Sequence, residues 1–469
     1  MQLQSRWKLE GKKLNYYGMR AKPYTLQNTL RLSRADRAWL ARVCSGDDAA
    51  PSNAMQRRLL REKIVVDERE LRKIPERIED AAFCTRCCAN DYIIPGLELS
   101  EAGLCPMCEG EADVRALESV IPTVEEIAPS PGRLYDAAVF YTGGKDSSFL
   151  LWYLSKYKKR RVLALTWEIP YMSESARRSM ENARRALPGV SFVRWSMDDR
   201  SLATFYDRLF ELQNNHCACP SLAYVLFFPM LSALEVPYLV LGNEPAQVRN
   251  LYFNNIAPRI AFSYHKSRAL ETLLNCGRAL CLKRPVDFAQ YAYLCAVRNL
   301  VCRPGLMHKA ASRSFGAIGN IRAALGEIDG FQAAMRRAVR RADRAGRMPR
   351  LVHIDLGRAA GGTYDWNNVK ALLEREVGWE GAREAHKGLH TSCALERVKE
   401  HSQFEAFRRM ETQTIPFSAV ELCCAVSLGS ITREAAIEEM KTACGFLAEA
   451  PEESACMHRF VKGALGRGV

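Results

Sequence analysis

The chain has 469 residues and a mass of 52.8 kDa, about three times the usual size of one domain, so two or three domains are expected. A composition of 48% hydrophobic and 26% charged residues is globular and excludes a disordered, collagen-like or coiled-coil protein. The opening residues lack the apolar run of a secretory signal, and the most apolar stretch, residues 221–242, is interrupted by Pro229, Glu235 and Pro237. We therefore expect a soluble, cytoplasmic protein without a membrane span.

Two segments account for the whole net charge of +14. Residues 1–42 carry a surplus of eight positive charges, and residues 336–350 carry a surplus of six. Such patches attract polyanions, and contact with RNA or a nucleotide-linked substrate is compatible with them. The alternative is a solvated helix face, because Phe331, Met335, Val339 and Ala342 repeat at helical spacing.

Five regions follow one another along the chain. Residues 1–80 are predicted as a basic, mostly helical extension, residues 81–112 as a cysteine knuckle and residues 113–133 as a linker. In residues 134–310, apolar runs of strand length (DAAVFY, VLALTW, VSFVRW and PYLVLG) alternate with amphipathic helical patterns. This alternation predicts an α/β domain, an open parallel sheet joined by crossover helices. Residues 311–469 are predicted to be a mostly helical C-terminal region.

The first strand of that sheet ends in FYTGGKDSS, residues 140–148. Two glycines permit a tight turn close to a ligand, and the next helix directs its amide hydrogens at an anion such as phosphate. The segment is not a GxxxxGK[ST] loop, because Val139 and Asp146 occupy positions that such a loop fixes differently. It resembles instead the PP-loop, the SGGKDS signature of ATP pyrophosphatases of the adenine nucleotide alpha hydrolase superfamily, with Thr142 in place of the first serine.

This resemblance implies a HUP-like domain that cleaves ATP between the α and β phosphates, places AMP on a substrate oxygen and releases pyrophosphate. Gly143, Gly144, Ser147 and Ser148, beside Thr142, would then bind the pyrophosphate end through backbone and hydroxyl groups.

The resemblance also implies roles for the charged residues of the turn and for the neighbouring strand ends. Lys145 would neutralise charge on the phosphates, and Asp146 would hold Mg²⁺. Thr166 and Glu168 lie where relatives hold the adenosine, although Glu168 departs from the expected aspartate or asparagine. Gly242 has the position of a nucleotide-facing glycine, and a simple turn at a strand end explains it equally well.

Four cysteines form two CxxC pairs, Cys84 with Cys87 and Cys105 with Cys108. Two such knuckles complete a tetrahedral four-thiolate site, so a structural Zn²⁺ is predicted. Cys88 is spare, since the CxxC spacing favours Cys87. Buried packing of these cysteines is the alternative.

The wider context is similar to the N-acetyl sugar amidotransferases of bacterial surface-glycan pathways. The likeness rests on CTRCCANDYIIPGLELSEAGLCPMC, the PP-loop, LTWEIPYMSESARRSMENARRAL, HTSCALERVKEH and ELCCAVSLGSITREAAIEEM, and covers roughly residues 83–445. It implies replacement of a substrate oxygen by nitrogen on an N-acetyl sugar or related precursor, with ammonia from a separate glutaminase subunit. Thr432 is expected to cap the helix that begins in ITREAA.

A further cysteine pair, Cys217 and Cys219, opens the apolar helix before the last predicted strand. Superfamily relatives that thiolate tRNA carry persulfide or an iron–sulfur cluster on such a pair with a third cysteine, and Cys302 or Cys393 are the candidates here. A helix N-terminus lowers a thiol pKa, so Cys217 and Cys219 are candidate catalytic groups, with structural packing as the alternative.

Three functions consequently remain open. The first is ATP-dependent amidation, and the second is thiolation of tRNA or a small molecule. The third is nucleotide binding without catalysis, against which Lys145 and Asp146 argue. His216 and His390 are possible acid–base groups or ligands, and each also fits a structural histidine.

Overall fold

The computed structural model describes residues 1–20, 29–110, 114, 117–216, 218, 221–302, 316–382 and 387–467. Its largest sheet has five parallel strands in the spatial order β10-β9-β6-β7-β8. Their bounds are β6 Ala137–Phe140, β7 Val162–Trp167, β8 Ser191–Trp195, β9 Tyr238–Leu241 and β10 Arg350–His353. The chain runs outward from β6 to β8 and then returns to add β9 on the other side of β6, so the order reverses at β6 and β9, where α/β proteins bind ligands. The four predicted strands and the α/β class are confirmed.

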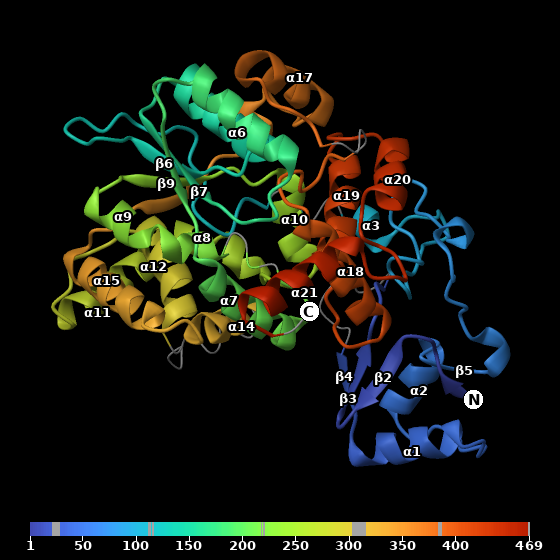
Figure 1. Cartoon of the computed structure of the whole chain (residues 1–469). Coiled ribbons are helices and arrows are strands. Elements are labelled where there is room, and N and C mark those ends of the chain that lie inside the picture. The colour runs from blue at the N-terminus through green and yellow to red at the C-terminus, as the bar shows by residue number, and fades with distance from the viewer. Residues whose placement is uncertain are drawn as a thin grey trace.

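Helices cover both faces of this sheet (Figure 1). One layer contains α5 Lys145–Trp152, α6 Glu174–Ala186 and α17 Trp366–Val377, which pack on one another. The opposite layer contains α8 Ser221–Leu226, α9 Phe228–Ala233, α12 Phe288–Val301, α14 Gly316–Gly326 and α15 Phe331–Ala345. Strands β6 and β7 are buried almost throughout, because parallel strands covered on both faces need continuous apolar runs.

Strand β10 lies within the region predicted to be mostly helical. It pairs in parallel with β9, from Arg350 opposite Tyr238 to His353 opposite Leu241. The preceding linker also joins this edge, since Thr123 bridges His353. A four-residue strand gives little periodicity, and its partner lies more than a hundred residues earlier, so sequence pattern alone did not reveal it.

The N-terminal residues form two small sheets with two helices, so the prediction of a mostly helical extension is wrong there. Strands β2 Trp7–Glu10, β3 Lys13–Tyr16 and β4 Thr29–Arg31 are antiparallel, while β1 Gln2–Leu3 pairs with β5 Val65–Val66. The helices are α1 Arg34–Cys44, which begins with a capping box between Ser33 and Asp36, and α2 Ala54–Arg61. Trp7, Tyr16 and Trp39 contribute to a separate hydrophobic core.

The C-terminal helices connect the cysteine segment to the α/β domain. They are α18 Leu395–Arg408, α19 Phe417–Ser427, α20 Arg433–Thr442 and α21 Glu452–Ala464. Helix α19 packs on α10 Pro245–Phe253 and on α3 Pro106–Glu109, which carries the second CxxC pair. Thr432 caps α20 through the Ala435 N–H, as predicted (3.3 Å).

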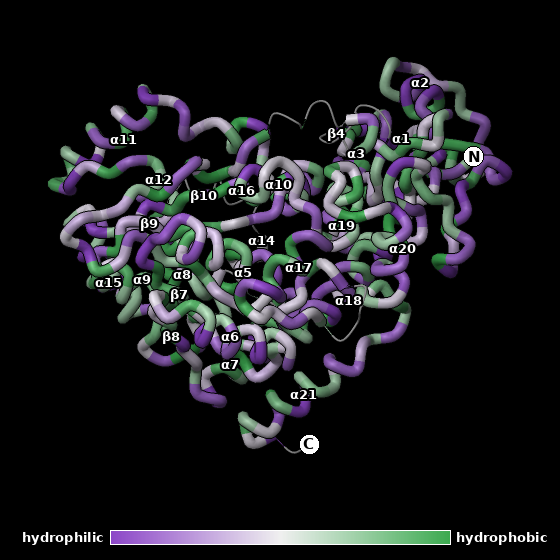
Figure 2. The backbone as a smooth tube through the Cα atoms, turned by 90° about the horizontal axis from the view of Figure 1, so that it is seen from above, coloured by the Kyte–Doolittle hydropathy of each residue, from purple (hydrophilic) through white to green (hydrophobic). Residues whose placement is uncertain are grey.

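Three α-helices of the described chain remain. They are α7 Asp199–Gln213, which packs on α14 and α21, α11 Arg268–Leu280 and the short α16 Leu356–Ala359. Helix α11 and the N-terminal sheets occupy opposite ends of the molecule in both views (Figure 1, Figure 2). Within the described ranges, no helix has both the length and the apolar character of a membrane span.

Candidate functional site

The predicted phosphate-binding turn follows β6, at the point where the strand order reverses. Gly143 has φ +72°, and a Cβ there would overlap the carbonyl oxygen of Ala176 at the start of α6. Only glycine fits, because both the backbone conformation and the space exclude a side chain. Gly144 is the N-cap of α5, so this helix directs its N-terminal amide hydrogens and positive dipole end into the turn.

Hydroxyl groups hold the turn in shape. The Ser147 hydroxyl donates to the carbonyl oxygen of Gly144 (3.1 Å) and lies 3.1 Å from the Thr142 hydroxyl. Thr142 is exposed and Ser147 half-buried, whereas Ser148 is buried beneath them. The exposed edge of the turn is therefore polar and carries hydroxyl groups.

The other predicted nucleotide-binding positions have structural contacts. The Thr166 hydroxyl is buried and donates to the carbonyl oxygen of Tyr141 (2.7 Å), which ties the ends of β6 and β7 together. At Gly242, a Cβ would press on the side chains of Leu356 and Leu150. Glu168 is paired with Arg177 (3.0 Å).

Lys145 is buried in a box of acidic and aromatic side chains. Its ammonium pairs with the carboxylates of Asp146 and Glu244, the second at 3.1 Å. The same nitrogen lies 4.5 Å from the ring centre of Tyr364 and 5.0 Å from that of Trp366. Two carboxylates and two π faces together compensate for the loss of water around this charge.

Glu244 is the most deeply buried carboxyl group of this box, with no exposed surface. Trp366 Nε1–H donates to Glu244 Oε1 (2.9 Å), and Lys145 holds the other oxygen. Burial raises the pKa of Glu244 to about 7, and the attraction of Lys145 offsets that effect only in part. A carboxyl group that titrates near neutrality therefore lies directly behind the turn.

Asp146, unlike the fully buried Glu244, is half-buried. Within the described residues, its hydrogen bonds from Lys145 and from the Tyr364 hydroxyl (2.8 Å) both go to Oδ1. This arrangement fixes the carboxylate and leaves Oδ2 as the oxygen that can ligate Mg²⁺.

A C-terminal segment packs over the turn. The backbone N–H of Lys145 donates to the Thr391 hydroxyl (3.4 Å), and Trp379 Nε1–H donates to the carbonyl oxygen of Gly143 (3.0 Å). Cys393 follows closely and bridges Met172 after β7. Residues of the HTSC stretch thus lie next to the turn at Gly143 and Gly144, although they are some 250 positions later in the sequence.

The two histidines singled out from the sequence have different surroundings. His390 Nε2 lies 2.8 Å from Glu421, and although burial opposes the charge, Glu396 and Glu421 raise the pKa of His390 to about 9. His216 stacks on Phe210, and burial, followed by repulsion from His458, lowers the pKa of His216 to about 4. The surroundings of His390 therefore favour its charged form, and those of His216 favour its neutral form.

Not all the candidate cysteines can be placed. Cys217 and Cys219 lie outside the described residues. Cys302 caps the end of α12 and is half-buried, and Cys393 lies beside the turn as described above.

The four cysteines of the two CxxC pairs converge. Cys84, Cys87, Cys105 and Cys108 are buried, and their sulfur atoms all lie within 4.8 Å of one another. The Sγ atoms of Cys84 and Cys108 are 3.8 Å apart, and those of Cys87 and Cys105 are 3.6 Å apart. Metal–sulfur bonds of about 2.3 Å in a tetrahedron require separations of about 3.8 Å, so these thiolates can hold a metal ion such as Zn²⁺.

Groups around the cluster fix the two knuckles. The backbone N–H of Ala89 donates to Cys87 Sγ (3.4 Å), and that of Cys105 donates to Cys84 Sγ (3.2 Å). Arg433, in the first turn of α20, donates to the carbonyl oxygens of Cys84 (2.9 Å) and Cys87 (3.1 Å). The spare Cys88 instead contacts Cys423 of α19, with 3.7 Å between the sulfur atoms.

Sequence reasoning missed the box around Lys145. Glu244 follows strand β9 by three residues. A carboxylate at the carboxyl end of a strand that neighbours β6 is a signal for a site residue, and this signal was present in the sequence. Tyr364, Trp366 and Trp379 gave no comparable signal, because only the fold brings their segment to the turn.

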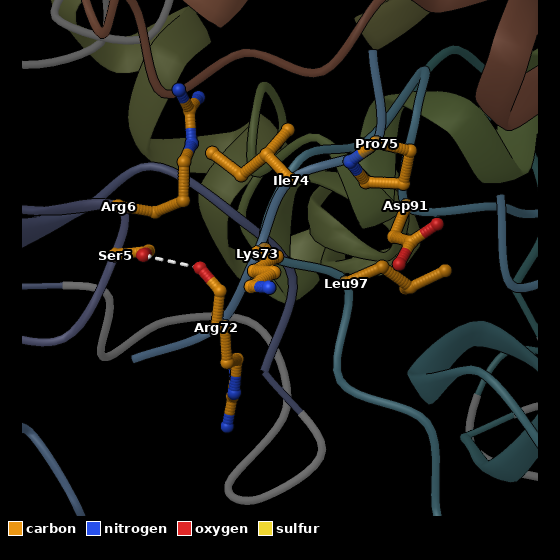
Figure 3. A pocket seen from close by; sticks show the side chains of 9 residues that line it. Ser5, Arg6, Arg72, Lys73, Ile74, Pro75, Asp91 and Leu97 are labelled. Atoms are coloured by element: carbon orange, nitrogen blue, oxygen red, sulfur yellow. Dashed lines mark hydrogen bonds between the residues drawn. The ribbon is translucent and has the colours of Figure 1, made fainter. Parts of the chain in front are cut away.

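A separate pocket lies between the N-terminal strands and the cysteine segment (Figure 3). Arg6, Arg72 and Lys73 supply its positive charge. Arg6 donates to the carbonyl oxygens of Tyr17 and Arg408 (2.6 Å each), and Arg72 pairs with Glu98 (2.9 Å). The bond to Arg408 fastens the N-terminal residues to the end of α18, and the pair with Glu98 joins Arg72 to the cysteine segment. These contacts account for the two arginines without a ligand.

Comparison of this chain with protein-family models and with curated proteins finds no match.

Proposed function

We propose that this protein is an ATP-dependent enzyme that adenylylates a substrate oxygen and releases pyrophosphate. The observation that carries the proposal is the turn at Gly143 and Gly144. It joins the central strand β6 to the N-terminus of α5, where the strand order reverses, in a backbone conformation that only glycine accepts there. Backbone amides and a helix dipole in that position favour a bound phosphate group.

In the proposed reaction, the substrate oxygen attacks the α-phosphorus of ATP, and the bond to the β-phosphate oxygen breaks to release pyrophosphate. A nitrogen nucleophile then forms a bond to the activated carbon, and the oxygen departs with AMP. The turn aligns the phosphates for in-line attack and stabilises the charge that develops on them.

Each residue of the turn has a part in this proposal. The amides at the start of α5, together with the hydroxyl groups of Thr142 and Ser147, bind the pyrophosphate end. Asp146 holds Mg²⁺, which would neutralise phosphate charge when bound. Because the ammonium of Lys145 is enclosed by Tyr364 and Trp366, it acts chiefly by fixing Asp146.

Amidation of an N-acetyl sugar or related glycan precursor, with ammonia from a glutaminase partner, is the preferred overall reaction. It rests on the sequence resemblance, which includes the HTSC stretch that packs against the turn. Thiolation is the second candidate, and one observation favours it: Cys393 lies two residues beyond Thr391, which contacts Lys145. In that case Cys217 and Cys219 would complete the sulfur-carrying set.

The test is incubation of the full chain with ATP, Mg²⁺, candidate acceptors and either ammonium or sulfide, followed by measurement of AMP, pyrophosphate and product mass. Asp146→Asn should abolish pyrophosphate release, whereas Asp329→Asn, an exposed carboxylate in the turn before α15, should not change it. Equal turnover of the two variants would refute the assigned role of Asp146.

The same incubation separates the two reactions. Exchange of oxygen for NH supports amidation, and exchange for sulfur, together with protein-bound iron and labile sulfide, supports thiolation.

A further inference from the structure

Helix α11 has the reverse of the usual amphipathic pattern. The polar side chains on its inner side form hydrogen bonds with the rest of the protein. Asn275 accepts from the backbone N–H of Val286 (2.9 Å) and donates to its carbonyl oxygen (3.0 Å), and Arg278 donates to Asp343 (2.7 Å). Its leucines point mostly outward, with Leu273 69% and Leu280 88% exposed. A surface helix normally buries its apolar face, so this face calls for a covering partner.

Two further exposed apolar residues lie near the helix in sequence, one on each side. Leu282, directly after α11, is 89% exposed, and Ile260, shortly before it, is 71% exposed. Leu282 also adopts φ +54°, a backbone conformation that leucine rarely takes. Because its side chain is so exposed, packing within the described chain does not offset the cost of that conformation. Among the exposed large hydrophobic residues of the described chain, the four with the greatest exposure all lie between residues 260 and 282.

Positive charge surrounds this apolar surface. Between residues 255 and 285, Glu271 is the one acidic residue, while Arg259, Arg268 and Arg284 are exposed. The backbone N–H of Arg284 donates to the carbonyl oxygen of Arg344 (3.2 Å), which places the exposed arginines of α15 next to the end of α11. The exposed arginines Arg340, Arg341 and Arg344 therefore continue the basic rim, whereas Arg347 and Arg350 pair with Glu235 and Asp287.

Three kinds of partner compete for such a surface. A second copy of the chain would bring two basic rims together, and like charges repel. RNA would satisfy the arginines but would leave the leucines exposed to water. An anionic lipid surface satisfies both, since its phosphates attract the arginines and its acyl boundary accepts the leucines.

We propose that α11 and the Leu282 tip dock this protein peripherally on an anionic membrane surface. Leu273, Leu280 and Leu282 enter the boundary between headgroups and acyl chains, and the arginines of the rim contact lipid phosphates. The inference is independent of the proposed ATP chemistry, because none of these residues lies at the turn.

Cosedimentation of the full chain with vesicles tests the proposal. Vesicles of phosphatidylcholine with about 30% phosphatidylglycerol should bind the protein, whereas pure phosphatidylcholine should not, and salt should weaken the binding. The triple variant Leu273→Ser, Leu280→Ser, Leu282→Ser should lower the partition coefficient at least about tenfold while leaving the thermal midpoint unchanged. Leu447→Ser, an exposed leucine (40%) among the C-terminal helices, should bind like the unaltered protein.

Three results would overturn the proposal. The first is a failure of the unaltered chain to bind anionic vesicles. The second is a dimer in sedimentation equilibrium that the triple variant loses, which would assign the face to a second copy. The third is vesicle binding that the triple variant retains and that excess tRNA abolishes, which would assign the arginines to RNA.

Discussion

The replacement Glu244→Gln tests the electrostatics behind the turn. Glutamine is nearly isosteric with a protonated glutamic acid, so the variant keeps the shape of the box around Lys145 but no longer titrates. Glu244 has an ordinary pKa of 4.5, which burial raises to about 7 in the folded protein. Between these pH values the folded state binds more protons than the unfolded state, so the contribution of Glu244 to stability is fully present below pH 4.5 and falls as the pH rises to about 7.

The size of the effect follows from the pKa difference. Each pKa unit corresponds to about 1.4 kcal/mol, so the unaltered protein should lose roughly 3 kcal/mol of unfolding free energy between about pH 4.5 and about pH 7 that Glu244→Gln does not lose. The amide adds a constant cost of about 1–3 kcal/mol, because its single carbonyl oxygen cannot accept from both Lys145 and Trp366. That cost shifts the curve of the variant without changing its slope.

Urea denaturation of both proteins across this pH range measures the effect as the difference between the two curves. Glu396→Gln is the control, because the attraction of Lys399, working against burial, lowers the pKa of Glu396 to about 2. Its contribution is present above pH 4.5 and falls as the pH drops towards 2, the opposite direction. Parallel curves for the unaltered protein and Glu244→Gln between about pH 4.5 and about pH 7 would refute the assigned burial of this carboxyl group.

Three further predictions concern the turn and the cysteine cluster. Gly143→Ala should cost about 2–5 kcal/mol of stability, because the left-handed backbone and the overlap with the Ala176 carbonyl oxygen add, and it should abolish ATP-dependent pyrophosphate release. Gly189→Ala, where a Cβ meets no atom within 4 Å, should leave that release intact; normal release in Gly143→Ala would contradict the assigned turn. Cys105→Ser should reduce bound zinc, measured by elemental analysis, and Cys88→Ser should not; equal zinc in both variants would show that the ligands are misassigned. Arg433→Ala should leave zinc content unchanged but speed zinc loss to a chelator several-fold, because the two knuckles lose their shared donor; an unaltered rate would remove that role.

Local sequence signals were sufficient for the parts of the fold that local interactions determine. Strands β6 and β7 contain buried apolar runs, the glycines mark the turn, and Thr432 caps its helix. The convergence of the two CxxC pairs could be predicted from their spacing, because each knuckle presents two thiols from one short loop. In these cases the residues that interact are close in sequence or belong to a recurring pattern.

Long-range pairing explains what the sequence did not reveal. Strands β1 to β5 are two to four residues long, too short for alternation to stand out from the neighbouring basic residues. Strand β10 is equally short and depends on β9 for its hydrogen bonds. The partners of Lys145 come from residues 244 to 366, and nothing in the local sequence joins those segments. Burial of a charge is decided by the complete fold.

The late position of these partners has a consequence for biosynthesis. Tyr364 lies 218 residues after Asp146, and Thr391 lies 246 residues after Lys145. When the turn has emerged from the ribosome, most of the remaining chain must therefore still be synthesised before the ammonium of Lys145 can be enclosed. Until then the sheet of the nascent chain also lacks β10, and β9 is an unpaired edge strand. This is the interval in which a chaperone would protect that edge from pairing with other chains.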